Sequence, residues 1–220
     1  MTAALRAACI VVMAALTLAP DAAAQEPVSA TPAPPAHRSA FTRTVVFFGG
    51  AAAGLGVHEL GHVVFAGALG ANPSVKPIHY GPIPFFAIDH DPVPRRQEFV
   101  ISSAGLWFQQ GTAEWLLTAR PELRSEQAPF LKGYLAFHVA TSVVYGVAAF
   151  ARIGPPERDT LGIASSLGRD GVPEPLVGAL VLAPGLLDAY RYRNPRAKWA
   201  VWASRGVKIT GVVLTAWAGK

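Results

Sequence analysis

One run of 26 residues, 44–69, constrains the fold more than any other part of the chain. Its only ionisable side chains are His58, Glu59 and His62. About 20 apolar residues in a helix are enough to cross the hydrocarbon core of a bilayer, so this run predicts a transmembrane helix. Three ionisable groups close together in such a helix are costly unless they face the interior of a bundle. The run therefore predicts a membrane span with a functional site inside it.

The composition agrees with membrane insertion. Hydrophobic residues make up 51% of the 220 residues and charged ones only 15%, with a mean hydropathy of +0.32. An ordinary soluble domain carries about 25% charged residues. The length leaves room for about four or five spans but not for a large second domain. We therefore expect an all-α membrane protein, a bundle of about four transmembrane helices.

Four further apolar segments follow along the chain, at residues 99–118, 130–151, 175–190 and 199–218. The first two are long enough to span a bilayer. The third is shorter and contains Pro184, which makes it either a short span or a half-helix. The last carries Arg205 and Lys208 near its middle, so an interfacial helix competes there with a further span. We expect residues 44–173 to form the membrane-embedded core and residues 174–220 to form C-terminal membrane or interfacial helices.

Residues 71–98 interrupt the helical pattern. They include six prolines and two short β-prone runs, 75–80 and 83–88, on either side of Gly81 and Pro82. This pattern predicts a β-hairpin-like or re-entrant loop after the first span. A hairpin could pair with an extended substrate as an added strand, although a simple interfacial loop is an equal alternative.

The N-terminal residues 1–24 are expected to be a signal peptide. A charged start is followed by an apolar stretch at 7–18 and by three alanines at 22–24 as a cleavage site. Residues 25–43, rich in proline and alanine, are expected to form an extracytoplasmic linker. The only cysteine, Cys9, lies in the signal peptide, so the mature chain has no thiol for a disulfide, a nucleophile or zinc binding. An uncleaved anchor is the alternative.

The net charge of +5 and the pI near 9.7 come with basic residues at the ends of apolar runs. Examples are Arg191, Arg193, Arg196 and Lys198. Cations that flank spans account for this charge, so we expect membrane lipids as partners and no nucleic acid. With a cleaved signal peptide, we expect an integral protein of a bacterial inner membrane whose mature N-terminus lies outside the cytoplasm.

The five residues from His58 to His62 match the pattern HExxH. Residues four apart in a helix lie on one face, so both imidazoles can bind one Zn²⁺, with Glu59 beside the metal. Zinc lowers the pKa of a bound water, and a neighbouring glutamate can take its proton and pass it to a leaving amine. The motif therefore predicts a zinc-dependent hydrolase of peptide bonds.

A span that carries His-Glu-Leu-Gly-His resembles the site-2 protease family of intramembrane zinc metalloproteases. The hairpin-like stretch and the small residues 102–105 are also similar to that family's core. The resemblance implies that His58 and His62 bind zinc with a downstream aspartate, that Glu59 is the general base, and that the substrates are membrane-associated proteins or peptides. The family's usual Leu-Asp-Gly ending is missing. The alternative is therefore a catalytically inactive zinc-binding membrane protein that acts as a binding or regulatory partner.

Two aspartates compete as the third zinc ligand. Asp188 has the closer local likeness to the family's motif, with Ala189 in place of the expected glycine, whereas Asp159 keeps neighbouring prolines in shifted positions. If the first three apolar segments each cross the membrane once, Asp159 lies on the same side as the histidines. A fourth full crossing would carry Asp188 to the other side. We favour Asp159 and keep Asp188 as the alternative.

Three polar side chains inside the later apolar segments are candidates to line the site: Glu114, Gln109 and His138. A carboxylate is costly to leave unpaired in lipid, which favours a partner or a site for Glu114. Glutamine and histidine also serve as hydrogen-bonding groups between helices, so both roles stay open for Gln109 and His138.

Overall fold

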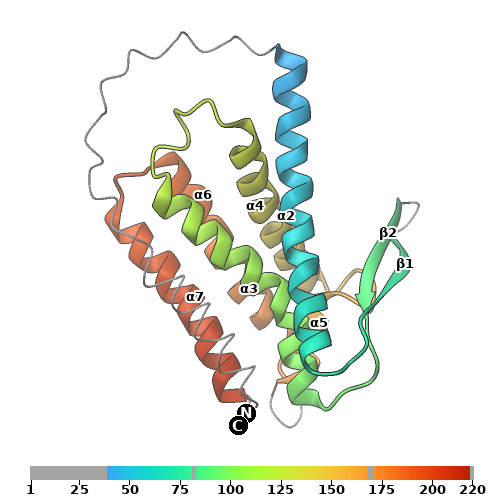
Figure 1. The fold of residues 1–220 in the computed structure, drawn as a ribbon. Helices are drawn as coiled ribbons and strands as arrows, with labels where there is room; N and C mark the ends of the chain where they lie inside the picture. Colours follow the sequence, from blue (N-terminus) through green and yellow to red (C-terminus); the bar gives the residue numbers. More distant parts are fainter. Residues whose placement is uncertain (1–38, 81–82, 168–170, 219–220) are drawn as a thin grey trace.

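The computed structural model describes residues 39–80, 83–167 and 171–218 (Figure 1). The expected signal peptide and nearly all of the expected linker lie outside these ranges. The chain is mostly helical, and its elements in order are α2 (Ala40–Ala68), β1 (Ser74–Tyr80), β2 (Ile83–Asp89), α3 (Arg95–Ala119), α4 (Pro129–Ala151), α5 (Asp159–Ser166), α6 (Glu174–Arg193) and α7 (Lys198–Ala218).

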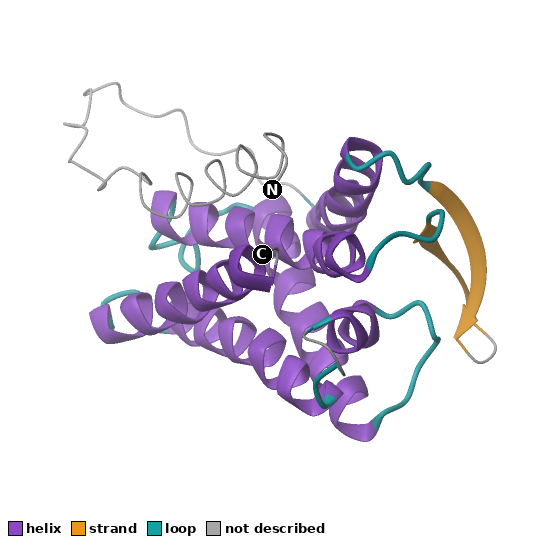
Figure 2. Ribbon diagram, turned by 90° about the horizontal axis from the view of Figure 1, so that it is seen from below, coloured by secondary structure: helices purple, strands orange, loops and turns teal. Residues whose placement is uncertain are grey.

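The β-hairpin expected after the first apolar helix is confirmed. Its two strands pair antiparallel, with Ser74 opposite Asp89 and Tyr80 opposite Ile83. Figure 2 shows the hairpin standing at one side of the helices rather than between them. Prolines occupy both strands, as is usual only where a strand lies at a sheet edge, and in a two-stranded sheet each strand is an edge.

Helices α2 and α3 begin earlier than the expected apolar segments, at Ala40 and Arg95 rather than at residues 44 and 99. Helix α2 begins at Ala40, because the Ser39 hydroxyl accepts a hydrogen bond from the Thr42 amide and caps the helix start. The last residues of the expected linker are therefore helical. Helix α6 has 20 residues and continues past Pro184, so the proline does not end the helix.

Two of the described helices, α2 and α4, are long and apolar enough to cross a membrane. A bundle of four spans is therefore not confirmed. Helices α3, α6 and α7 have 25, 20 and 21 residues, which is sufficient length at 1.5 Å per residue, but each carries several charged side chains. Several of these charged side chains are buried, namely Glu114, Glu174, Asp188, Arg191 and Lys208, whereas Arg95, Arg96, Arg193 and Lys198 are exposed.

The most apolar helices lie at the outside of the bundle. Only 11% of the most apolar stretch of α2 is buried, and 33% of that of α4. The outward side chains are large, for example Phe48 on α2 and Val144 and Phe150 on α4, all more than half exposed. The buried residues of α2 are mostly glycines and the two motif histidines. The large apolar side chains of these two helices thus lie mostly on the surface, whereas such side chains usually face the core of a soluble protein.

Glycines bring α2 and α4 into close contact. A methyl group at Gly50 would lie 1.9 Å from the Phe130 carbonyl oxygen, and one at Gly133 would lie 1.8 Å from the Phe47 carbonyl oxygen. Both positions therefore accept no larger residue without a shift of the backbone. Small residues of this kind are the usual means by which helices pack in membranes.

An apolar core joins α2, α3, α6 and the short helix α5. It includes Phe65 of α2, Phe99 and Trp107 of α3, Ile163 of α5 and Val181 of α6. Each fully buried side chain of this size contributes about 1.5–3 kcal/mol to stability. The core holds α5 against α3, and the first residue of α5 thereby comes close to the HExxH helix.

Candidate metal centre

The two histidines of the motif project from one face of α2 into the protein. His58 and His62 lie one helical turn apart and are 2% and 6% exposed. Helix α3 passes directly behind them, because a methyl group at Gly61 would lie only 2.7 Å from the Ala104 carbonyl oxygen. Glycine at this position therefore sets how closely the motif packs against α3.

Asp159 completes a group of three ligand-type side chains. Its Oδ2 atom lies 3.1 Å from His58 Nε2 and 3.4 Å from His62 Nε2, and the two Nε2 atoms are 3.3 Å apart. Among the described residues, His58, His62 and Asp159 form the group of histidine and acidic side chains that could hold a metal ion. The sequence favours Asp159 over Asp188 as the third ligand, and in the structure Asp159 lies beside the two histidines.

The spacing of the three atoms fits a metal ion of the size of zinc. Ligands about 2.0–2.1 Å from a tetrahedral zinc are about 3.3 Å from one another. The three distances cluster around that value. The Asp159 Oδ2 atom is buried and has no hydrogen-bond partner among the described residues. A buried carboxylate oxygen without a donor is costly, and a cation would remove that cost.

The hydrogen bonds of the outer ring nitrogens leave both Nε2 atoms free to bind. His62 Nδ1 lies 2.8 Å from the Ile101 carbonyl oxygen, which can only accept, so Nδ1 carries the proton. His58 Nδ1 lies 3.0 Å from Gln109 Oε1 and donates in the same way. In neutral imidazole the other nitrogen then has a lone pair. Two lone pairs and one carboxylate oxygen converge on one point.

Residues on both sides of Asp159 are tied to Glu174, the first residue of α6. Arg158 donates to its two carboxylate oxygens at 2.7 and 2.8 Å, and the Thr160 hydroxyl donates to Oε1 at 2.8 Å. Bidentate bonds between arginine and carboxylate restrict orientation as well as distance. These hydrogen bonds fix the start of α5 and with it the position of the Asp159 carboxylate.

Gly105 of α3 forms the floor of the centre. A methyl group there would lie 2.4 Å from His62 Nε2 and 2.8 Å from His58 Nε2. The absence of a side chain at Gly105 therefore leaves the space in which a metal would sit. The sequence pointed to this residue only as one of several small residues.

Replacement of Gly105 by alanine is expected to abolish metal binding although every ligand remains. The added methyl would occupy the space beside both Nε2 atoms. Zinc per purified chain, measured by elemental analysis, should fall from about one to near zero. Gly111→Ala is the matched control on the same helix, because a methyl group there meets nothing within 4 Å. Full zinc content in Gly105→Ala would show that the ion does not bind beside Gly105.

A cavity of about 670 Å³ opens onto the three ligands. Its walls come from α2, α4, the hairpin strand β2 and the loop that precedes α5. Glu59 borders it, half-buried, next to His58. Tyr145 of α4 also borders it, and its ring stacks on the His58 ring at 6.0 Å between centroids. Nothing in the sequence pattern had singled out Tyr145.

An ion pair links the hairpin to Glu157, one of the residues that border this cavity. The Lys76 ammonium of β1 donates to Glu157 at 2.8 Å, so the hairpin is linked to the loop that leads to Asp159. The hydrogen bond lowers the pKa of the Glu157 carboxyl and raises the pKa of Lys76. Because both groups remain charged near neutral pH, the link persists there.

The other polar residues singled out from the sequence lie away from the cavity. Gln109 and His138 are buried behind His58, and neither borders the cavity. Glu114 and Asp188 lie in a buried charge cluster with Arg191, Lys208 and Arg205. Asp188 is thus paired with cations and is not among the ligands that surround the histidines' Nε2 atoms.

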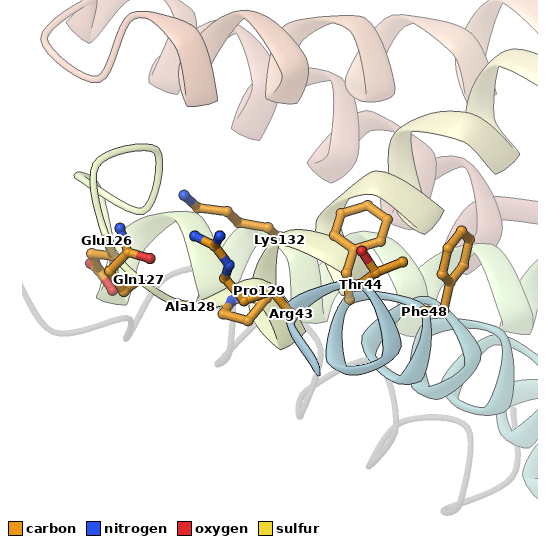
Figure 3. A pocket seen from close by; sticks show the side chains of 9 residues that line it. Arg43, Thr44, Phe48, Glu126, Gln127, Ala128, Pro129 and Lys132 are labelled. Atoms are coloured by element: carbon orange, nitrogen blue, oxygen red, sulfur yellow. The ribbon is translucent and has the colours of Figure 1, made fainter. Parts of the chain in front are cut away.

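Another cavity, of about 550 Å³, lies between the starts of α2 and α4 (Figure 3). Arg43, Phe48 and Lys132 are among its lining residues. Arg43 precedes His58 by 15 residues, which is about 22 Å along a helix. This cavity is therefore separate from the candidate metal centre.

Comparisons of the chain with protein-family models, with curated proteins and with solved structures found no match. Function is therefore inferred from the residues of the centre and the elements that hold them.

Proposed function

We propose that this protein is an intramembrane zinc metalloprotease, as its motif's resemblance to the site-2 protease family suggests. The observation that carries the proposal is the triangle of His58, His62 and Asp159 ligand atoms, with Glu59 beside it at the end of an open cavity. Structural zinc sites are closed by a fourth protein ligand, whereas catalytic sites keep one position open. Three protein ligands that face a cavity match the catalytic type.

The chain's own residues account for the chemistry. Zinc, when bound, would supply a Lewis acid for the scissile carbonyl and a water of lowered pKa. Glu59 would take a proton from that water and pass it to the leaving amine, which is the role of a general acid and base. No described side chain donates a hydrogen bond to the Glu59 carboxylate, so it is available for this transfer. Gly105 leaves the space that the ion would occupy, and the hydrogen bonds to Glu174 on both sides of Asp159 hold its carboxylate in position.

The cavity suits a largely apolar, extended peptide. Phe85, Phe86 and Ile88 of β2 border it, together with Phe137 and Val144 of α4. Strand β2 lies at an edge of its sheet, so its free backbone groups can pair with an extended segment. Proteolysis requires such an extended segment, because a helical backbone is already hydrogen-bonded internally. We propose membrane-associated proteins or peptides as substrates.

A location within a lipid bilayer is supported by the distribution of side chains. Helices α2 and α4 present exposed phenylalanine and valine side chains on their outer faces and bury glycines and polar groups. Helices α3, α6 and α7 bury Glu114, Asp188, Arg191 and Lys208, which pair with one another inside the bundle. We propose that these helices complete a membrane-embedded bundle. A cleaved signal peptide would orient α2 with its start outside the cytoplasm.

The experiment is cleavage of single-span peptides by the purified full-length protein in liposomes, with new termini identified by mass spectrometry. We expect cleavage with bound zinc, loss of cleavage after removal of the metal with a chelator, and recovery when Zn²⁺ is returned. Protein that carries zinc and binds these peptides but cleaves none of them would support the alternative, an inactive zinc-binding partner protein.

A further inference from the structure

A continuous series of hydrogen bonds runs from the candidate metal centre into the opposite side of the bundle. His58 Nδ1 lies 3.0 Å from Gln109 Oε1, Gln109 Nε2 lies 3.1 Å from His138 Nδ1, and His138 Nε2 lies 3.0 Å from Asp188 Oδ2. The four residues come from α2, α3, α4 and α6. All four are at most 2% exposed. Such buried polar groups are rare among apolar helices unless they have a function.

The direction of each bond follows from the chemistry of the groups. The Gln109 amide nitrogen also lies 3.0 Å from the His138 carbonyl oxygen, which can only accept, so the amide orientation is determined. Since an amide NH₂ only donates, His138 Nδ1 must accept, and His138 Nε2 must carry the proton toward Asp188. His58 Nδ1 likewise donates to the amide oxygen. Every bond therefore donates away from the metal centre and toward the carboxylate of Asp188.

The far end of the series is the Asp188 carboxylate, which is held by two cations and a hydroxyl group. The Lys208 ammonium lies 2.7 Å from Asp188 Oδ2, and Oδ1 accepts from the Ser204 hydroxyl at 2.6 Å and from Arg191 at 3.1 Å. Arg191 and Lys208 in turn bind Glu114. Three of these partners belong to helices α6 and α7, so the C-terminal helices hold the carboxylate in place.

We infer that Gln109, His138 and Asp188 are positioning residues for the metal centre: a one-way hydrogen-bond series that orients the His58 ring and increases the electron density at its Nε2. The inference deepens the proposed function and rests on its metal site. Aligned hydrogen bonds that end on a carboxylate polarise one another, and a histidine that donates to such a partner is a better metal ligand. His62 lacks this support, because its Nδ1 donates to a backbone carbonyl.

The test is the affinity of the full-length protein for Co²⁺, followed by its visible absorption and by competition with a chelator. Gln109→Met removes the first link at nearly constant volume and should weaken Co²⁺ binding by about 10–100-fold. Gln109→Glu keeps an acceptor for His58 but has no N–H to donate to His138, so it tests the first bond alone and should recover only part of that loss. Thr112→Val is the control, because Thr112 lies on the same helix and bonds to Tyr134 outside the series.

Proton NMR of the Co²⁺-loaded protein supplies a second readout. Two exchangeable ring protons shifted by the paramagnetic ion are expected, one from each coordinated histidine. In Gln109→Met the proton of His58 should exchange rapidly and disappear, while that of His62 remains. If Gln109→Met binds Co²⁺ with unchanged affinity and keeps both shifted ring protons, the inference is overturned while the metal site stands. Failure of the wild-type protein to bind Co²⁺ would overturn the metal site and the inference together.

Discussion

Replacement of Glu59 by glutamine is expected to lower the rate of peptide cleavage by about 10²–10⁴-fold, since this is the usual contribution of a general acid–base group. The amide has nearly the shape of the carboxylate but cannot take a proton from water. Glu59 borders the cavity and is not one of the three clustered ligands. The zinc content should therefore stay at that of the wild type while kcat falls.

The matched control for this variant is Glu157→Gln. Glu157 borders the same cavity, but its carboxylate is paired with Lys76. We expect only a modest change in cleavage, because this residue holds the cavity wall and does not face the ligands. A Glu59→Gln protein that cleaves peptides at the wild-type rate would exclude Glu59 as the base. Loss of zinc in that variant would instead assign Glu59 to the metal.

Alanine at His62 or Asp159 is expected to remove the metal altogether. Each substitution deletes one of the three atoms that surround the common point. A divalent ion left with two protein ligands should be lost during purification, so zinc per chain should fall from about one to near zero. No cleavage should remain in either variant.

Asp188→Asn separates the two aspartates. Its side chain points to His138, Lys208 and Arg191, away from the histidines' Nε2 atoms. The variant should hold about one metal per chain when metal is in excess, with a weaker affinity through His138 and Gln109. Complete loss of metal in Asp188→Asn, combined with full content in Asp159→Ala, would reverse the assignment of the third ligand. A folded protein must be verified for each variant by its thermal transition.

The sequence predicted the local parts of this structure well. The spacing of His58 and His62 required only a helix to place both rings on one face. The alternation of prolines with short β-prone runs predicted the hairpin, because several prolines close together disfavour a helix and a central strand. The lengths of the apolar runs likewise predicted helices at α3, α4 and α7, whose bounds agree to within a few residues.

Contacts between distant segments were harder to predict. Gln109, His138 and Asp188 form one series only because three helices bring them together over separations of 29 and 50 residues. No periodicity in the sequence carries that information. The same holds for Glu114, whose partners Arg191, Arg205 and Lys208 lie on two later helices. These ion pairs join helices α6 and α7 to α3.

Gly105 shows what a motif can and cannot indicate. Small residues at a helix contact are expected from sequence, since they allow close packing. Which of them faces the ligands depends on the rotation of α3 against α2, and that rotation follows from Gly61 meeting the Ala104 backbone. Tyr145 was missed for a similar reason, because a single aromatic residue in an apolar run gives no signal of a site.

The most direct measurement is zinc K-edge X-ray absorption on the purified wild-type protein, together with zinc per chain. The account predicts about one zinc, surrounded by two imidazole nitrogens and light oxygen ligands at about 2.0–2.2 Å. In Asp159→Ala the signal should vanish with the metal. A protein that remains free of zinc after exposure to excess Zn²⁺, or zinc bound through a single imidazole, would contradict the assignment of His58, His62 and Asp159 as a metal centre.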